Sequence, residues 1–317
     1  MITLAFLGCG RVARAHAKRL RRHKRDVEIA FASRDPKRAA QFSNELGGPA
    51  LGTYDDALAA PDVDVAVITT PPDVHKDLAL RALAAGKHVV IEKPPVATTA
   101  ELDEIATAAQ AAGKQVFVAE NYFYKPSLRR VRALITQGVI GDVLFVHTNA
   151  IKRQRSDDDW RSAHGALLEG GIHWIDFMAN LGLRVRDVRG FRPGEPAVHA
   201  ASPDRSMMIA FEYAEGAVGM LSYSWEVPST ARGLRLSKIY GKAGTITFES
   251  NGLWTLCHGK KLRFYLGLRD LAGYRAMWAD FVRAWKEGTP AAMTLAHARR
   301  DLELVEQAYA TAKKELS

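Results

Sequence analysis

Residues 6–13 of the chain are Phe-Leu-Gly-Cys-Gly-Arg-Val-Ala, and this stretch decides the fold. An apolar run from Ile2 precedes it and predicts a buried strand, while RVARAHAKRLRR after it predicts a helix. In a Gly-x-Gly-x-x-Ala turn, Gly8 permits the tight turn, Gly10 lets the backbone approach a pyrophosphate, and Ala13 allows close packing. The helix N-terminus adds N–H groups and a positive dipole. The pattern therefore predicts a dinucleotide site that includes Gly8, Gly10, Arg11 and Val12; taken alone, it also fits a plain tight turn.

Strand and helix patterns alternate up to residue 121. Apolar strands are expected at 27–33, 63–70, 87–93 and 115–121, with amphipathic helices between them. Such an order is typical of a parallel, doubly wound sheet covered on both faces, so we expect an α/β dinucleotide-binding Rossmann domain over residues 1–121. Ligands of such sheets bind at the carboxyl ends of the strands. Besides the glycine turn, four residues follow such ends: Ser33, Thr70, Lys93 and Asn121.

The pattern changes beyond residue 121. Helices are expected over 127–137, Leu167–Leu181, 274–286 and 295–314, and long segments of period-two alternation lie between residues 205 and 266. We therefore expect an α+β domain over 122–317 with a large, mainly antiparallel open sheet, which binds substrate and mediates oligomerisation. An open sheet needs its outer face covered by helices or by another subunit, so a homo-oligomer, a dimer or a tetramer, is expected.

Composition excludes several classes of protein. The 317 residues are 47% hydrophobic and 25% charged, and Cys9 and Cys257 are too few for a disulfide framework, which favours a cytoplasmic protein. No stretch approaches the roughly 20 apolar residues of a membrane helix, and no basic signal-peptide region is present at the N-terminus. The net charge is +9, but six basic residues lie within 18–25, without interleaved aromatics. We interpret them as a solvated helix end and expect neither nucleic acid nor membrane as a partner.

The end of the second predicted strand bears on cofactor choice. An NAD site usually has Asp or Glu there, whereas this chain has Ser33-Arg34, followed by Asp35 and Arg38. A hydroxyl and two guanidinium groups suit a 2′-phosphate, so NADP is favoured. Asp35 keeps NAD as an alternative, and the arginines also fit an ordinary helix start.

Three further segments carry candidate chemistry. Glu92-Lys93-Pro94-Pro95 ends a strand, and a lysine there can hydrogen-bond a substrate oxygen, although the segment taken alone favours a surface lysine at a strand end. The segment 69–75 enters a rigid turn that could line the cofactor or simply connect two elements; it contributes Thr70, Pro71, Pro72 and His75.

The third segment is Leu168-Glu169-Gly170-Gly171-Ile172-His173-Trp174-Ile175-Asp176. On one helix, Glu169, His173 and Asp176 would share a face, and the carboxylate could orient His173 as a general acid/base. A structural network on a helix face is the alternative. A Glu/His metal site lacks further clustered ligands, so no metal is expected.

Together the segments resemble the glucose–fructose oxidoreductase/inositol dehydrogenase (Gfo/Idh/MocA) family of nicotinamide-dependent sugar and polyol oxidoreductases. The resemblance covers the whole chain and rests on five motifs: GCGRVA at 8–13, TTPPDVH at 69–75, EKP at 92–94, AENYFYKP at 119–126 and WRSAHGALLEGGIHWID at 160–176. It implies that Lys93 and His173 act at the reacting carbon of the substrate. The family commonly has Asp four residues before this histidine, where this chain has Glu169, whose additional methylene keeps the charge but displaces the carboxylate.

The resemblance implies hydride transfer between nicotinamide and a sugar or polyol bound between the domains, with alcohol and ketone interconverted. His173, oriented by Glu169, would take the hydroxyl proton, and Lys93 would polarise the same oxygen. The cofactor site would also include Glu92 and Asn121, and the substrate would contact Tyr122, Trp160, Arg161 and Asp176. The competing hypothesis is a catalytically silent nucleotide-binding sensor or regulator on the same fold, for which the change to Glu169 is the only sequence hint.

Overall fold

The computed structural model describes residues 1–154, 164–194, 202–228, 234–267 and 269–314. The chain divides into two compact units. The first unit contains Met1–Glu120 and Tyr274–Arg299, and the second contains Asn121–Gly273 and Arg300–Ser317. The first crossing of the chain, at 120/121, lies one residue before the expected boundary at 121/122, and the segment Tyr274–Arg299 returns to the first unit.

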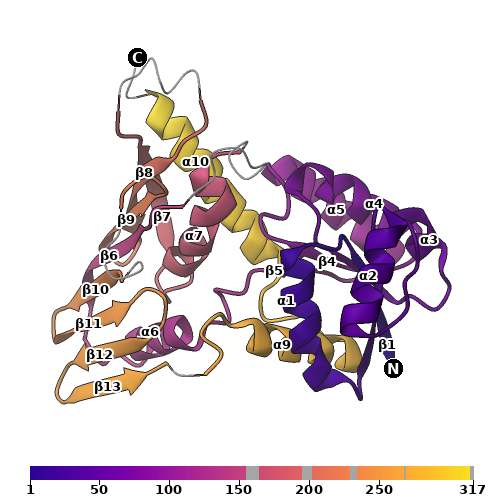
Figure 1. Ribbon diagram of the computed structural model, residues 1–317. Coiled ribbons are helices and arrows are strands. Elements are labelled where there is room, and N and C mark those ends of the chain that lie inside the picture. Colours follow the sequence, from indigo (N-terminus) through magenta and orange to yellow (C-terminus); the bar gives the residue numbers. More distant parts are fainter. Residues whose placement is uncertain (155–163, 195–201, 229–233, 268, 315–317) are drawn as a thin grey trace. The chain divides into compact units, whose positions relative to one another are not determined.

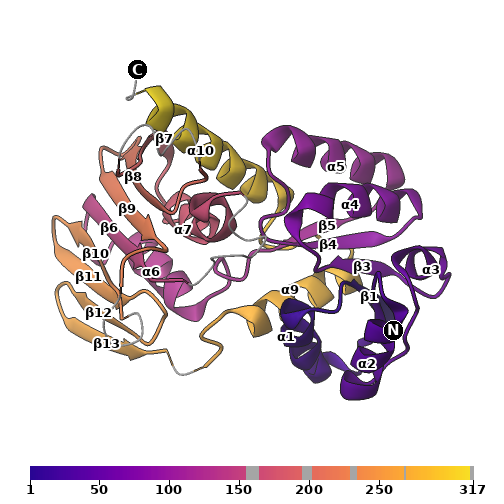
Figure 2. The same ribbon diagram turned by 45° about the horizontal axis from the view of Figure 1, so that its top comes forward.

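The first unit is built on a five-stranded sheet of order β2-β1-β3-β4-β5 in which every pair is parallel. Figure 2 shows α4 and α5 on one face of this sheet and α1, α2 and α9 on the other. Both faces are covered because the strands are almost continuously apolar and buried. The strands are β1 (Ile2–Leu7), β2 (Val27–Ala32), β3 (Val65–Ile68), β4 (His88–Glu92) and β5 (Val116–Ala119). The α-helices are α1 (Arg11–Leu20), α2 (Pro36–Leu46), α3 (Tyr54–Ala59), α4 (His75–Ala84), α5 (Thr99–Ala112) and α9 (Tyr274–Glu287). The Rossmann prediction is confirmed.

Local sequence signals fix several helix starts in this unit. Asp35 caps α2 by accepting the Lys37 N–H at 3.0 Å, with Pro36 at the first helical position. Thr98 and Glu101 form a capping box at the start of α5. The basic cluster lies at the end of α1 and in the short 3₁₀ helix η1 (Arg21–His23), where most of its side chains are exposed. This placement agrees with a solvated helix end.

The second unit is built on an eight-stranded sheet of order β13-β12-β11-β10-β6-β9-β8-β7. All neighbouring strands are antiparallel except β6 and β9, which pair in parallel. The strands are β6 (Val143–Ile151), β7 (Val185–Phe191), β8 (Ser206–Tyr213), β9 (Val218–Ser224), β10 (Leu236–Gly241), β11 (Gly244–Glu249), β12 (Trp254–His258) and β13 (Leu262–Leu266). Figure 1 shows α6 (Pro126–Thr136), α7 (Ile172–Ala179) and α10 (Leu295–Lys314) along one side of this sheet. The prediction of a mainly antiparallel open sheet is confirmed.

The segment predicted as one helix over Leu167–Leu181 is different in the structure. Residues Leu167–Gly171 form a π-helical turn, and an ordinary α-helix, α7, begins only at Ile172. The spacing that places Glu169, His173 and Asp176 on one face assumes a continuous α-helix, whereas the first five residues of this segment are π-helical. The prediction of one continuous α-helix was therefore wrong over residues 167–171.

Candidate functional site

The glycine turn lies where the order of the parallel sheet reverses. It follows β1, which pairs with β2 on one side and β3 on the other. Gly8 has φ of 113° and donates its N–H to Ala32 O at 3.0 Å. A Cβ on Gly8 would lie 3.1 Å from the backbone carbon and oxygen of Thr69, so any side chain there would disturb the loop after β3. Gly8 thus brings the ends of β1 and β3 together at the point where ligands of such sheets bind.

Gly10 leaves the start of α1 open. A Cβ on Gly10 would meet no atom within 4 Å, and no side chain caps the helix at this position. The first backbone N–H groups of α1 are therefore available to an anion, and the backbone can be approached closely. Arg11 and Val12 form the first turn of the helix, with Arg11 exposed.

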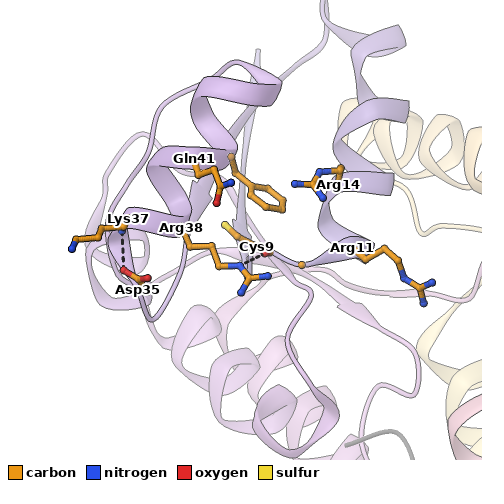
Figure 3. A pocket seen from close by; sticks show the side chains of 9 residues that line it. Cys9, Arg11, Arg14, Asp35, Lys37, Arg38 and Gln41 are labelled. Atoms are coloured by element: carbon orange, nitrogen blue, oxygen red, sulfur yellow. Dashed lines mark hydrogen bonds between the residues drawn. The ribbon is translucent and has the colours of Figure 1, made fainter. Parts of the chain in front are cut away.

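A pocket of about 410 Å³ opens beside this turn (Figure 3). It is rich in cations: four basic side chains and one carboxylate line it. Arg38 reaches from α2 to the turn and donates its Nε–H to Cys9 O at 2.8 Å. Burial raises the pKa of the Cys9 thiol to about 11, so it is a neutral wall of the pocket. The lining residues are Cys9, Gly10, Arg11, Arg14, Asp35, Lys37, Arg38, Gln41 and Phe42.

The three residues expected to recognise a 2′-phosphate follow β2 and have different surroundings. Ser33 is buried, and its Oγ accepts the Asp35 N–H at 3.4 Å. Arg34 and Arg38 are both exposed, but Arg38 lines the pocket, whereas Arg34 interacts with Tyr54 of α3. Burial raises the pKa of the Tyr54 phenol, and the Arg34 charge acts against that rise. Of the two arginines, Arg38 is therefore the one that lines the pocket.

The segment after β3 is held by a buried histidine. His75 Nε2 lies 2.9 Å from Thr70 O, and His75 Nδ1 lies 3.0 Å from Pro94 O and 3.2 Å from Pro95 O. Burial lowers the pKa of His75, while these carbonyl contacts oppose that shift. His75 therefore joins the loop after β3 to the loop after β4 from within. Pro71 precedes a short 3₁₀ helix, η2 (Pro72–Val74), as expected for a rigid turn.

Glu92 and Lys93 end β4 in different surroundings. The Glu92 carboxylate is buried, hydrogen-bonds His16 of α1 through Oε1, and accepts the Lys93 N–H through Oε2 at 3.1 Å. Lys93 itself is half-buried. The Glu92 side chain, which was expected at the cofactor site, lies against His16 of α1 and the Lys93 backbone.

In the second unit, His173 stacks on Tyr122. Their ring centroids are 4.1 Å apart and their planes are inclined by 10°. The Lys125 ammonium lies 4.2 Å from the same Tyr122 centroid and donates to Ser250 O at 3.3 Å. Glu169 is buried in the π turn, one turn before the half-buried His173. The structure thus brings together an imidazole, a phenol and a buried cation.

The π turn is fixed by close packing at its glycines. A Cβ on Gly170 would lie 2.1 Å from Tyr223 Oη, which accepts the Trp225 Nε1–H at 2.6 Å. A Cβ on Gly171 would lie 2.7 Å from Leu167 Cδ1. The two glycines therefore let the turn approach β9 more closely than any side chain would allow.

A buried carboxylate fixes the start of the same turn. Asp204 accepts the Leu167 N–H at 2.9 Å and the Tyr309 O–H at 2.6 Å. Burial raises the pKa of Asp204, whereas both hydrogen bonds lower it. Burial and the Asp204 charge raise the pKa of Tyr309 as well. The backbone that leads to Glu169 is thus tied to α10.

Two of the remaining residues expected to bind substrate or cofactor are buried in the second unit, and two lie outside the described residues. Asp176 is fully buried, and its Oδ1 accepts the Asn180 Nδ2–H at 2.7 Å, which favours a structural role. Asn121 is buried in the second unit and donates to Ala272 O at 2.5 Å. Trp160 and Arg161 lie outside the described residues.

Sequence reasoning missed several residues of the pocket and of the turn. Arg14, Lys37 and Gln41 line the pocket because α1 and α2 present them beside the glycine turn. A count of one helical turn from Arg11 and Arg38 could have found Arg14 and Gln41. No local signal pointed to Asp204 and Tyr309, which meet from distant parts of the chain.

Neither a metal centre nor a membrane span is found in the part of the chain that the structure describes. No cluster of three His, Cys, Asp or Glu side chains there is suited to a metal ion. No helix there has the length and apolar character needed to cross a bilayer.

Comparison with protein families agrees with this geometry. Residues 2–120 match the model of an oxidoreductase family with an NAD-binding Rossmann fold, and residues 128–247 match the model of the GFO/IDH/MocA C-terminal domain. The chain belongs to the Gfo/Idh/MocA oxidoreductase family. The Gfo/Idh/MocA motifs identified from the sequence all lie in the two matched segments or in the short link between them.

Individual relatives are more distant. A trans-1,2-dihydrobenzene-1,2-diol dehydrogenase of Mus musculus is 30% identical over 211 residues, which span 64% of this chain and 62% of the mouse enzyme. The match thus covers less than two thirds of that relative. Two solved structures have the same Gfo/Idh/MocA fold at 20% identity, each covering 99% of this chain and 97% of its own. They are levoglucosan dehydrogenase in complex with NADH and L-sorbose, with a TM-score of 0.87, and an NAD binding oxidoreductase from Klebsiella pneumoniae, with a TM-score of 0.88.

Proposed function

We propose that this chain is a nicotinamide-dependent oxidoreductase that interconverts an alcohol and a ketone on a sugar or polyol. The observation that carries the proposal is the glycine turn at the reversal point of the parallel sheet, which opens into a cationic pocket. Family membership and relatives named as dehydrogenases of a vicinal diol and of an anhydrosugar support the reaction class.

The residues of the first unit fit a dinucleotide. Gly10 leaves space against the backbone, and the uncapped start of α1 offers N–H groups to a pyrophosphate. Within the described residues, Thr70 Oγ1 is buried at the end of β3 without a hydrogen-bond partner, so a ligand could satisfy it. When bound, the nicotinamide supplies or accepts the hydride.

We propose NADP as the preferred cofactor. Arg38 is fixed on Cys9 O at the pocket wall, and Arg11, Arg14 and Lys37 add positive charge around it. A 2′-phosphate carries negative charge that guanidinium groups bind well. Asp35 is the one carboxylate in the lining and favours NAD, but its Oδ1 already caps α2. NADH and NAD in family structures keep NAD as the alternative.

For the chemical step, we propose His173 as the group that takes the hydroxyl proton and Lys93 as a donor to the reacting oxygen. His173 is half-buried, and its ring is oriented by stacking on Tyr122. Glu169, buried one turn earlier, is proposed to stabilise the imidazolium that forms. Tyr122, Trp160 and Arg161 are proposed to bind the substrate.

We also propose a homo-oligomer that covers the open face of the eight-stranded sheet. Strand register places Tyr240, Phe145 and Val218 side by side across β10, β6 and β9. Phe145 and Val218 are 47% and 45% exposed, and Met220 and Met208 continue the apolar surface over β9 and β8. A second copy would bury this surface by two-fold symmetry.

Light scattering should report a mass above that of one chain, and Phe145→Asp should lower this mass. A monomeric wild type would contradict the proposal.

The cellular compartment is proposed from the cysteines. Cys9 and Cys257 are both free and buried, which is typical of proteins kept in a reducing environment. We propose a cytoplasmic location.

The test is a titration of the purified protein with NADPH and NADH, followed by a panel of sugars and polyols that includes levoglucosan and myo-inositol. Turnover is followed at the nicotinamide absorbance. Tight NADPH binding with turnover of any panel member would support the whole proposal, and a preference for NADH would overturn the NADP assignment alone. Cofactor binding without turnover would favour a silent sensor, and absence of binding would overturn the function.

A further inference from the structure

A buried network in the first unit lies behind the end of β4. His16 of α1 has no exposed surface, hydrogen-bonds Glu92 Oε1 through Nε2, and accepts the Trp278 Nε1–H through Nδ1 at 2.9 Å. Trp278 belongs to α9, which reaches the first unit from the C-terminal part of the chain, and it is also fully buried. Neither His16 nor Trp278 belongs to the cofactor pocket described above.

The chemistry of the indole fixes the tautomer of His16. An indole N–H is only a donor, so Nδ1 of His16 must hold a lone pair. The single ring proton is then on Nε2 and is donated to Glu92. A proton on Nδ1 would oppose the Trp278 N–H, so the contact requires a lone pair on that nitrogen.

Aromatic packing keeps this imidazole in place. The His16 ring meets the Trp278 ring edge-on with centroids 5.4 Å apart, and it meets the Tyr274 ring edge-on at 5.0 Å. Arg19 lies over the Tyr274 ring. The imidazole is therefore enclosed between α1 and α9 and has little freedom to turn away from Glu92.

The Glu92 carboxylate connects His16 to the Lys93 backbone through two hydrogen bonds. Its Oε1 accepts the His16 Nε2–H and its Oε2 accepts the Lys93 backbone N–H at 3.1 Å. Glu92 is also the last residue of β4 and pairs with Ala119 of β5. The carboxylate is thus fixed from one side by the sheet and from the other by His16, and it holds the first backbone group after the strand.

We infer that His16 and Trp278 are positioning residues for Lys93, acting through the Glu92 carboxylate on the Lys93 backbone. The inference rests on the proposed function for the catalytic role of Lys93, but not for the network itself. A lysine that must hydrogen-bond a reacting oxygen needs its main chain fixed, because small displacements of a catalytic group cost large factors in rate.

Two substitutions at one position separate hydrogen bonding from packing. His16→Gln can still donate an amide N–H near the place of Nε2, whereas His16→Leu cannot. Hydrogen exchange of the Lys93 amide should become about tenfold faster in H16L and stay close to the wild-type rate in H16Q. With any polyol that the wild type turns over, kcat should fall about tenfold to 100-fold in H16L with KM for the cofactor little changed, and H16Q should recover most of kcat.

His88 provides the matched control. It begins the same strand at the opposite end, and its Nδ1 accepts the Gln115 N–H at 3.0 Å. H88L and H88Q should leave both the Lys93 exchange rate and kcat near wild type. Nitrogen-15 shifts of the His16 ring provide a separate test of the tautomer, with Nδ1 expected to be unprotonated and Nε2 protonated.

Three outcomes would overturn the inference: H16L with wild-type exchange and kcat, H16Q as impaired as H16L, or the opposite His16 tautomer. If the wild type turns over no substrate, the proposed function fails, and the exchange rates and ring shifts alone decide whether the network positions Lys93.

Discussion

The imidazole of His173 lies almost parallel to the phenol ring of Tyr122, with centroids 4.1 Å apart and an angle of 10° between the planes. Because the Lys125 ammonium lies 4.2 Å from that same phenol centroid, it is no more than about 8 Å from the imidazole. The ring of Tyr122 therefore packs against both the His173 imidazole and a buried cation.

This stack leads to a prediction for Tyr122. Tyr122→Phe keeps the ring, so kcat should stay within about twofold of wild type, while KM for the polyol should rise as the hydroxyl is lost. Tyr122→Ala removes the stacking surface and should lower kcat by about 100-fold. Steady-state kinetics check both values, and a Phe variant as slow as the Ala variant would contradict the orienting role.

His173→Ala should lower kcat by about 100-fold to 10,000-fold and leave cofactor affinity unchanged.

Arg38 is expected to decide the cofactor preference. Arg38→Ala removes a charged donor from the pocket wall, and losing one charge-assisted hydrogen bond should weaken NADPH binding by about tenfold to 100-fold. NADH binding should change much less. Lys37→Ala, at a neighbouring exposed position of the same pocket, is the matched control and should affect NADPH weakly. Equal losses for NADPH and NADH in R38A would refute a 2′-phosphate contact.

Gly170 is expected to be the more restrictive of the two glycines in the π turn. Gly170→Ala would place a Cβ 2.1 Å from Tyr223 Oη and should lower the free energy of unfolding by about 1–3 kcal/mol. Gly171→Ala meets the end of the flexible Leu167 side chain and should cost less. Thermal unfolding compares the two variants. Adding Tyr223→Phe to G170A should recover part of the loss, and no recovery would show that the clash lies elsewhere.

The Asp204–Tyr309 hydrogen bond makes a prediction about pH. Tyr309→Phe should lower the free energy of unfolding by about 1–3 kcal/mol at neutral pH, because the buried Asp204 carboxylate loses a donor. Burial already raises the pKa of Asp204, and loss of this donor raises it further. Asp204 of the folded variant then binds a proton more tightly than Asp204 of the unfolded chain, so its contribution to stability is greatest in acid and is lost as pH rises through the folded pKa. The deficit of Y309F relative to wild type should therefore shrink as pH falls.

Tyr213 provides the control for that experiment. Its hydroxyl is buried and donates to Met178 O at 3.1 Å, a neutral acceptor that does not titrate. Tyr213→Phe should cost a similar free energy with no dependence on pH across the acid range. Denaturant unfolding from neutral to acid pH measures both variants, and parallel profiles would exclude a role for the Asp204 charge.

Local signals predicted the elements that depend on nearby residues. The Asp35-Pro36 start of α2 and the Thr98/Glu101 capping box of α5 each involve residues only two or three positions apart, so signals of this kind lie within a short stretch of sequence. The buried parallel strands were readable from their continuous apolar runs. Strand β7 was missed because its charged residues hide the alternation, and α3 was missed because it has only six residues.

Other features depend on partners far away in the sequence. The π turn lies where Gly170 and Gly171 approach Tyr223 of β9. The sequence of residues 167–181 does not indicate that Tyr223 will be their neighbour. Likewise, Tyr274–Glu287 was readable as a helix, but its membership of the first unit depends on contacts such as Trp278 with His16. The candidate residues were therefore predictable as types at strand ends, whereas the groups that hold them were not.

The return of α9 to the first unit has a consequence for any attempt to divide this protein. The polypeptide passes from one unit to the other three times, at residues 120/121, 273/274 and 299/300. A truncated protein that stops at Glu120 would leave His16 without its tryptophan and would uncover the surface of β5 where Phe117 packs on Phe281 and Trp285. An independent nucleotide-binding module, or a chimera that exchanges it, therefore has to carry residues 274–299 as a grafted second piece.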